Sequence, residues 1–157
     1  PIGNMLLGEP LSISFDPALR GGPKLEGGCL TLLDRGANRA EQVTSWYLQQ
    51  AQAYLERRLP ELAHTVGVTP HIIRLKDQRT RWGSCSSKGN LNFNWRLVMA
   101  PPYVFDATII HELAHLRELN HSPQFWSLVR DYCPHYPKAK AWLREHGSGI
   151  RAWQYVN

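Results

Sequence analysis

The stretch from His111 to His121 constrains this chain more than any other, because it places three histidines within eleven residues. The first two form the pattern His-Glu-x-x-His, with His111 and His115 four residues apart. On an α-helix such residues lie about one turn apart on the same face, so both imidazoles can bind one ion. Glu112 then lies beside the pair, where its carboxylate can reach a water on that ion without binding the ion itself. The stretch therefore predicts a metal site with a base next to it.

The third histidine can join the site only if the helix ends before it. On an unbroken helix, His121 would lie about 15 Å along the axis from the first histidine. Asn120 suits a helix end, since asparagine tolerates the left-handed conformation, and Ser122 and Pro123 suit the N-cap and first residue of a following helix. We therefore expect a buried helix over 103–119, a corner at His121 and a short helix after it.

Two carboxylates compete with His121 as the third ligand. Glu118 shares the helix face, but it lies about 10.5 Å along the axis from the first histidine, which is too far for one ion. Glu145 could come from a later helix, and the sequence leaves it open. Catalytic zinc uses three protein ligands and keeps a fourth position for water, whereas structural zinc usually fills all four positions and favours cysteine. We therefore expect Zn²⁺ bound by His111, His115 and His121, with Glu112 as the general base.

The composition predicts one globular domain over residues 1–157. Hydrophobic residues make up 43% of the chain and charged residues 20%, as is typical of such domains. No run approaches the roughly 18 apolar residues of a membrane-spanning helix, so we expect no membrane contact and a cytoplasmic location. The three cysteines, Cys29, Cys85 and Cys133, are odd in number and widely spaced, which argues against a disulfide framework. Residues 1–4 are left out of the fold prediction, and the oligomeric state stays open.

The N-terminal part, residues 1–37, is predicted to be hairpin-like. Residues 11–15 alternate apolar and polar, residues 29–33 form a second apolar run, and the segment between them is rich in glycine and proline. Asn38 followed by Glu41 then predicts a capped helix start.

A long amphipathic helix should follow this start. Its apolar side chains recur at helical spacing over 39–59. Pro60 should limit the run, and a short continuation over 61–65 should end at Gly67.

The motif-bearing part, residues 72–147, contains the remaining strands. Residues 71–76 are typical of a strand, and residues 80–85 and 91–96 predict an antiparallel pair joined by a turn. The predicted class is therefore α+β, with a small antiparallel sheet packed on helices and a buried His-Glu-x-x-His helix followed by a short helix.

Positive charge gathers between Arg74 and Arg96. Six basic residues there accompany one acid, Asp77, in a chain of net charge +5. Such a patch can be a solvent-exposed basic face, or it can be a surface that binds nucleic acid. A basic nucleic-acid-associated module with a structural metal is thus an alternative to an enzyme.

Several motifs together resemble the YgjP-like metallopeptidases, relatives of the SprT-like zinc peptidases. The resemblance covers about residues 72–147 and rests on Arg81–Asn90, Asn94–Leu97, His111–His115, Asn120–Trp126 and Trp142–Gly147. It implies a compact α+β zinc peptidase acting on peptides or proteins, with ligands at His111, His115 and His121 and a base at Glu112. Because SprT-like relatives are linked with DNA, a DNA-linked protease that needs activation is a further alternative.

Other residues near these motifs are weaker candidates for a role in the reaction. Arg81, His135 and Tyr136 could help to stabilise an oxyanion. Cys85 is not expected to be a nucleophile, because no base partner can be assigned to it. The strand over residues 81–85 could border the cleft and pair with an extended substrate. Alternatively, Trp82 and Gly83 could simply pack against the metal helix.

Overall fold

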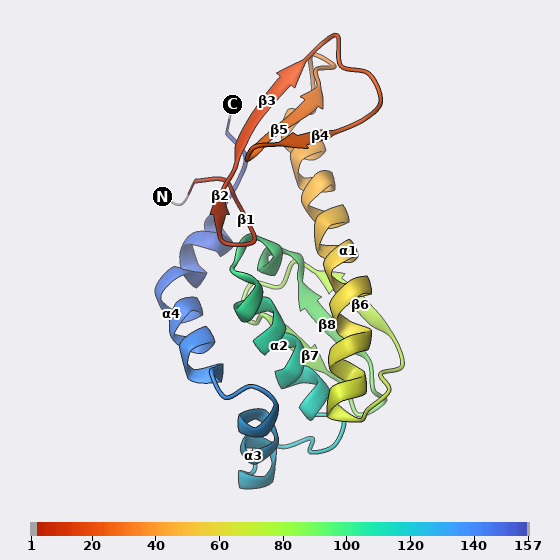
Figure 1. Cartoon of the computed structure of the whole chain (residues 1–157), viewed down its shortest axis with the longest axis vertical. Helices are drawn as coiled ribbons and strands as arrows, with labels where there is room; N and C mark the ends of the chain where they lie inside the picture. The colour runs from red at the N-terminus through yellow and green to blue at the C-terminus, as the bar shows by residue number, and fades with distance from the viewer. Residues whose placement is uncertain (1–2, 157) are drawn as a thin grey trace.

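The computed structural model describes residues 3–156 and confirms the α+β class (Figure 1). Four α-helices and small sheets make up the fold. The helices are α1 Arg39–Val66, α2 Pro102–Ala114, α3 Pro123–Tyr132 and α4 Tyr136–Ala152, with a 3₁₀ helix at Trp95–Met99. The strands are β1 Met5–Leu6, β2 Glu9–Pro10, β3 Ser12–Asp16, β4 Lys24–Glu26, β5 Cys29–Leu33, β6 Ile73–Lys76, β7 Gly83–Cys85 and β8 Leu91–Asn94. No helix in residues 3–156 is long and apolar enough to cross a membrane.

The sheet next to the metal-binding motif has the order β6-β8-β7. Its β7 and β8 pair antiparallel, as predicted, and Gly83 lies opposite Phe93. The sheet is mixed, however, because β6 joins the other edge of β8 in parallel. Leu91 and Phe93 of β8 are fully buried. The central strand therefore points these side chains into the core, and β7 forms one edge of the sheet.

The predicted pairing of residues 11–15 with 29–33 as a hairpin is wrong. Both strands exist, but β3 and β5 run parallel, and β4 pairs antiparallel with β5. The glycine-rich connection is long enough to return the chain and to add a third strand, so the tight turn is the one at Gly27 and Gly28, both with positive φ. This sheet lies beyond the N-terminal end of α1, at the top of Figure 1.

Helix α1 starts and ends where the sequence predicts, but not for all the predicted reasons. Asn38 has left-handed backbone angles and makes no side-chain cap, whereas a capping asparagine has an extended backbone. The helix also continues through Pro60 as a single element to Val66. Pro60 deprives only the carbonyl of Glu56 of a helical bond, and Glu56 is exposed, so water can replace that bond. Gly67 ends the helix in the left-handed conformation, as predicted.

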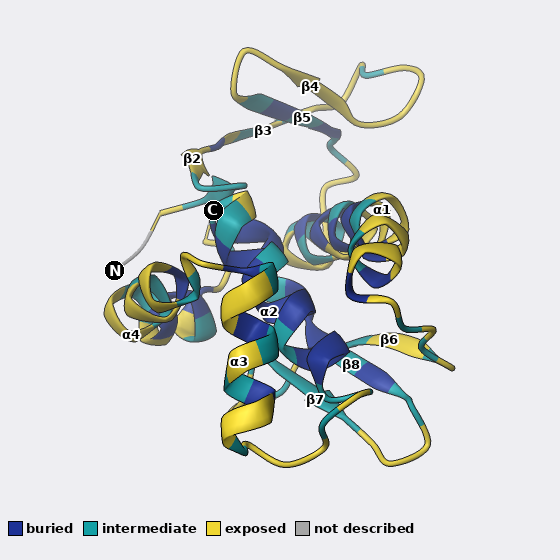
Figure 2. Cartoon of the chain, turned by 60° about the horizontal axis from the view of Figure 1, so that its bottom comes forward, coloured by how far each residue is buried: buried dark blue, intermediate teal, exposed yellow. Residues whose placement is uncertain are grey.

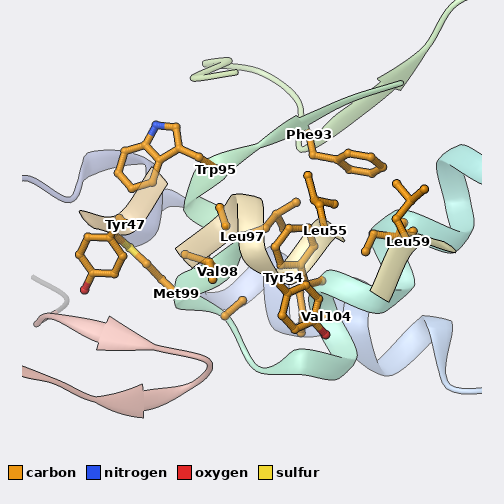
Figure 3. Close-up of a cluster of buried hydrophobic side chains, with 14 of the residues drawn as sticks. Tyr47, Tyr54, Leu55, Leu59, Phe93, Trp95, Leu97, Val98, Met99 and Val104 are labelled. Atoms are coloured by element: carbon orange, nitrogen blue, oxygen red, sulfur yellow. The ribbon is translucent and has the colours of Figure 1, made fainter. Parts of the chain in front are cut away.

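The main core lies where α1 and α2 meet β8 and the 3₁₀ helix (Figure 3). The ring of Tyr54 from α1 stacks on Phe105 from α2 at 4.6 Å between centroids. Phe105 also packs near Phe93 of β8. Figure 2 shows α2 as a largely buried helix between α1, α4 and the β7 side of the sheet. This packing holds α2, and with it the metal-binding motif, in one orientation.

Helix α2 ends at Ala114, five residues before the predicted end. The amides of Arg117 and Glu118 both bond to the carbonyl of Ala114, which closes the helix with a turn. Asn120 has no positive φ in the structure, so it is not the residue that stops the helix. The early end puts His115 at the C-cap and leaves residues 116–121 free to turn back.

Helix α3 begins as predicted. Pro123 is its first residue, and the Ser122 hydroxyl accepts a hydrogen bond from the Phe125 amide at 3.2 Å. The short helix after the motif is therefore fixed by a serine cap and a proline start.

Candidate metal centre

Three imidazole nitrogens converge at the end of α2. The Nε2 atom of His121 lies 3.1 Å from Nε2 of His115 and 3.4 Å from Nε2 of His111. One ligand atom from each histidine lies within 4.8 Å of the other two. Nitrogens bound tetrahedrally to zinc at about 2.05 Å lie about 3.3 Å from one another. The three side chains therefore fit one zinc ion in both chemistry and spacing.

Aromatic side chains of helix α3 contact all three imidazoles, and two of the rings stack on them. The His115 ring stacks on Phe125, with centroids 4.2 Å apart. The His121 ring stacks on Trp126 at 5.6 Å. Since His121 lies on an exposed corner, the indole fixes a ring that the backbone alone would leave free to rotate. The Ser122-Pro123 pair thus starts α3 and, through it, places Phe125 and Trp126 against the imidazoles.

The second nitrogens of the two helix histidines point away from the convergence point. His111 Nδ1 lies 3.0 Å from the hydroxyl of Tyr136, and His115 Nδ1 lies 3.1 Å from the backbone oxygen of Glu118. A proton on each Nδ1 can be donated to these oxygens, which leaves each Nε2 lone pair facing inward. The sequence alone suggests Tyr136 only as a group that could stabilise an oxyanion. Its contact with His111 depends on the placement of α4, which no local motif reveals.

The environment keeps the imidazoles of His111 and His115 neutral. Burial, and to a lesser extent the neighbouring His115 and His121, lower the pKa of His111 to about 3. Burial also lowers the pKa of His115. Neutral imidazole is the form that binds a metal ion, so these side chains are ready to bind one near neutral pH.

Glu112 lies next to the three histidines and is 5% exposed. Its Oε2 atom is 4.0 Å from Nε2 of His111. Burial raises the pKa of Glu112 to about 7, and the positive charge of Arg81 opposes that rise. Gly83 of β7 makes room for this carboxylate, because a Cβ at that position would lie 2.9 Å from Oε2. The carboxylate is thus enclosed between α2 and β7.

Neither rival ligand reaches the convergence point. Among residues 3–156, the group of side chains spaced to bind a metal contains only His111, His115 and His121. Glu118 contributes its backbone oxygen to His115 instead. Glu145 is exposed on α4, and its carboxylate lies 3.7 Å from His146.

The remaining sequence candidates lie around the site without entering it. Trp82 packs against α4, where a Cβ at Gly147 would meet its ring at 3.0 Å and Arg151 lies over the ring at 4.3 Å. Burial raises the pKa of the Cys85 thiol, which keeps it protonated. His135 is the exposed residue before α4.

One member of the predicted basic patch serves the fold. The Arg96 guanidinium donates to the backbone oxygens of Ile150 and Trp153 at 3.1 and 2.6 Å and lies over the Trp95 ring. Arg96 therefore caps the end of α4 instead of facing a partner. The other five basic residues of the patch are exposed: Arg74, Lys76, Arg79, Arg81 and Lys88.

The chain is similar in structure to the metallopeptidase zymogen jannalysin of Methanocaldococcus jannaschii, with 21% identity and a TM-score of 0.48 over 55% of this chain and 90% of that one. At this level of similarity, nothing about residues or mechanism follows for the present chain. No curated protein sequence matches significantly.

The family comparison reaches further than the motifs. The family described as YgjP-like, metallopeptidase domain, matches residues 5–146 and so includes the N-terminal strands, where the sequence offered no recognisable motif. Because the match covers most of the chain, the protein belongs to the YgjP-like metallopeptidase family.

Proposed function

We propose that the protein is a zinc-dependent peptidase in which His111, His115 and His121 bind the ion and Glu112 is the general base. The observation that carries the proposal is the convergence of three Nε2 atoms beside a buried carboxylate, in a member of a metallopeptidase family. Peptide-bond hydrolysis near neutral pH needs an activated water, a base for its proton and an acid for the leaving amine. The proposed site supplies all three.

When bound, the zinc ion would act as a Lewis acid that makes water nucleophilic near neutral pH and polarises the peptide carbonyl. The protein's own groups do the rest. Tyr136 and the Glu118 backbone oxygen hold the imidazoles of His111 and His115 in orientation. Glu112 takes the proton from the attacking water and returns it to the leaving amine, and its buried position beside the three histidines lets one carboxyl do both.

The outer edge of β7 offers a place for the substrate backbone. On the inner edge, Trp82 accepts a hydrogen bond from Asn94 and Ser86 donates one to Asn90. Because bonding alternates along an antiparallel strand, the backbone groups of Gly83 and Cys85 point to the outer edge. An extended peptide can pair with these groups as an added strand, and at Gly83 it would run beside Glu112.

Replacing the proposed base tests this function. We expect Glu112→Gln to keep zinc and the fold but to lower the rate of hydrolysis of an unfolded protein by about 10²–10⁴-fold, the usual contribution of a general base. Glu145→Gln, which removes an exposed carboxylate, is the matched control and should retain the parent rate. A Glu112→Gln protein that cleaves as fast as the parent would rule out this mechanism.

Binding of nucleic acid is a second candidate, favoured by the five exposed basic residues around β6 and β7. Three of them, Arg74, Arg79 and Arg81, form no salt bridge in residues 3–156. If this face binds DNA, a mobility shift at physiological salt should be lost when these arginines are neutralised and should persist in chelator. A DNA-linked peptidase would instead show hydrolysis that increases when DNA is added.

A further inference from the structure

A groove of about 390 Å³ borders His115 on the surface. Three segments line it: the loop after α1, the turn after β7 and the segment that follows α2. We call it the basic groove; its lining residues are Val68, Thr69, Ser86–Gly89, His115–Arg117 and Leu119. The groove therefore begins at one of the three proposed zinc ligands.

The charges in the basic groove have one sign. Lys88 and Arg117 are exposed on its walls, and no carboxylate is among the lining residues. Neither cation forms a salt bridge within residues 3–156. Arg117 also donates to the backbone oxygen of Val66 at 3.4 Å, which restrains its guanidinium at the wall. The groove thus offers two uncompensated positive charges.

The basic groove also has an apolar component. Leu116 lines it, and Leu119 is 52% exposed there. A ligand with a short aliphatic stem and a negative end matches this combination, because the stem can contact the leucines while the charge meets the two cations. Aspartate and glutamate side chains have this character.

Strand β7 connects the groove to the proposed site of cleavage. It runs from Gly83, which touches Glu112, to Cys85, and Ser86 then begins the turn that lines the groove. At about 3.3 Å per residue, the distance from Gly83 to Ser86 is about 10 Å. A substrate paired with the outer edge of β7 would therefore place a residue two or three positions from the cleaved bond at the groove.

We propose that the basic groove is a specificity site that binds an acidic side chain of the substrate, two or three residues from the cleaved bond, through Lys88 and Arg117. This inference rests on the proposed peptidase function and deepens it by naming a substrate class. It concerns recognition alone and requires no additional chemistry.

Digestion of a complex peptide mixture, with the cut sites identified by mass spectrometry, tests the preference. We expect aspartate and glutamate to be enriched about threefold or more at one position near the cut, as partly exposed charge pairs allow. Lys88→Glu should replace this preference with one for lysine and arginine. Lys76→Glu makes the same charge change on β6, the opposite edge of the sheet, and should leave the preference intact. Cleavage without an acidic preference, or equal effects of the two variants, would overturn the inference and leave the peptidase intact.

Binding provides a readout that does not depend on turnover. Fluorescence anisotropy of two labelled peptides, identical except for Glu or Lys at the enriched position, should show tighter binding of the Glu peptide to Glu112→Gln protein. Lys88→Glu in that background should reverse the order. If no peptide is cleaved, the proposed function fails. The inference can still be tested by measuring the binding of a set of peptides that each carry Glu at a different position. Binding of a single-stranded oligonucleotide that depends on Lys88, without binding of acidic peptides, would overturn the inference in favour of nucleic acid.

Discussion

Gly83 is the residue on which the position of the Glu112 carboxylate depends most directly. Its backbone φ is not in the positive region, so alanine is allowed there and any effect of the added methyl group is steric. Because that methyl group would lie 2.9 Å from Glu112 Oε2, we expect Gly83→Ala to displace the carboxylate and to lower kcat by tenfold or more while zinc is retained. Ser84→Ala, with its side chain on the opposite face, should keep kcat near the parent value. Equal kcat values for Gly83→Ala and the parent would contradict the close packing described.

Tyr136 orients His111 without facing the converging nitrogens. Tyr136→Phe keeps the ring but removes the oxygen that lies 3.0 Å from His111 Nδ1. Loss of such a partner typically weakens metal binding by about 10–100-fold. Competition with a chromophoric chelator measures this affinity. Tyr132→Phe removes a hydroxyl outside the site and is the control. Unchanged zinc affinity in Tyr136→Phe would show that the hydroxyl does not support the ligand.

At this scale the sequence predicts the groups that lie close together along the chain. His111, Glu112 and His115 lie within about one helical turn. The Ser122-Pro123 pair correctly predicts that a new helix begins just after His121. The contacts of Tyr136 and Gly83 could not be predicted in this way. They depend on how α4 and β7 pack against α2, and that packing is determined by the whole core.

The elements around the site show the same division. The antiparallel β7–β8 pair, the apolar spacing of the long α1 and the serine cap of α3 are local signals that the structure confirms, whereas the predicted Asn38 cap and the limit at Pro60 are wrong. The parallel pairing of β3 with β5 and of β6 with β8 has no local signal, because it joins strands separated by other segments. The sequence does not predict the early end of α2 either, because the apolar pattern continues past Ala114. The helix ends there because a turn over the following residues closes it.

The end of α4 depends on Arg96, which extends from the 3₁₀ helix. Its guanidinium bonds to the backbone oxygens of Ile150 and Trp153, and a lost bond to a charged group costs about 1.5–3 kcal/mol. We therefore expect Arg96→Met to lower the free energy of unfolding by about 2–3 kcal/mol in urea titrations. Arg74→Met, an exposed change on β6, should leave the unfolding midpoint within error of the parent. If the two variants were equally stable, Arg96 would not be the cap described here.

For the whole molecule, the buried Glu112 makes stability depend on pH when metal is absent. Its pKa is raised by burial from 4.5 to about 7, so the folded state favours the protonated form. The contribution of Glu112 to the stability of the metal-free protein is fully present below pH 4.5 and is lost as pH rises through about 7. The loss above that pH is on the order of 3 kcal/mol.

Urea unfolding in chelator, at pH 5 and pH 8, measures this effect. Glu112→Gln should be more stable than the parent by a margin that is largest at pH 8 and shrinks at pH 5, because glutamine has no charge to bury. Glu145→Gln, at an exposed carboxylate, should show no such pH-dependent margin. A margin for Glu112→Gln that is the same at both pH values would mean that the carboxyl is not desolvated in the folded protein.

That residues 1–157 form one domain remains a prediction. The assignment of the zinc ligands is the central claim, and it can be tested directly. The most direct measurement is the zinc content per chain after exchange into mild chelator, for the parent, His121→Ala and Glu145→Ala. With three imidazoles as the protein ligands, the parent and Glu145→Ala should each retain one zinc ion, and His121→Ala should lose it. Zinc lost from Glu145→Ala but retained by His121→Ala would contradict the proposed ligand set.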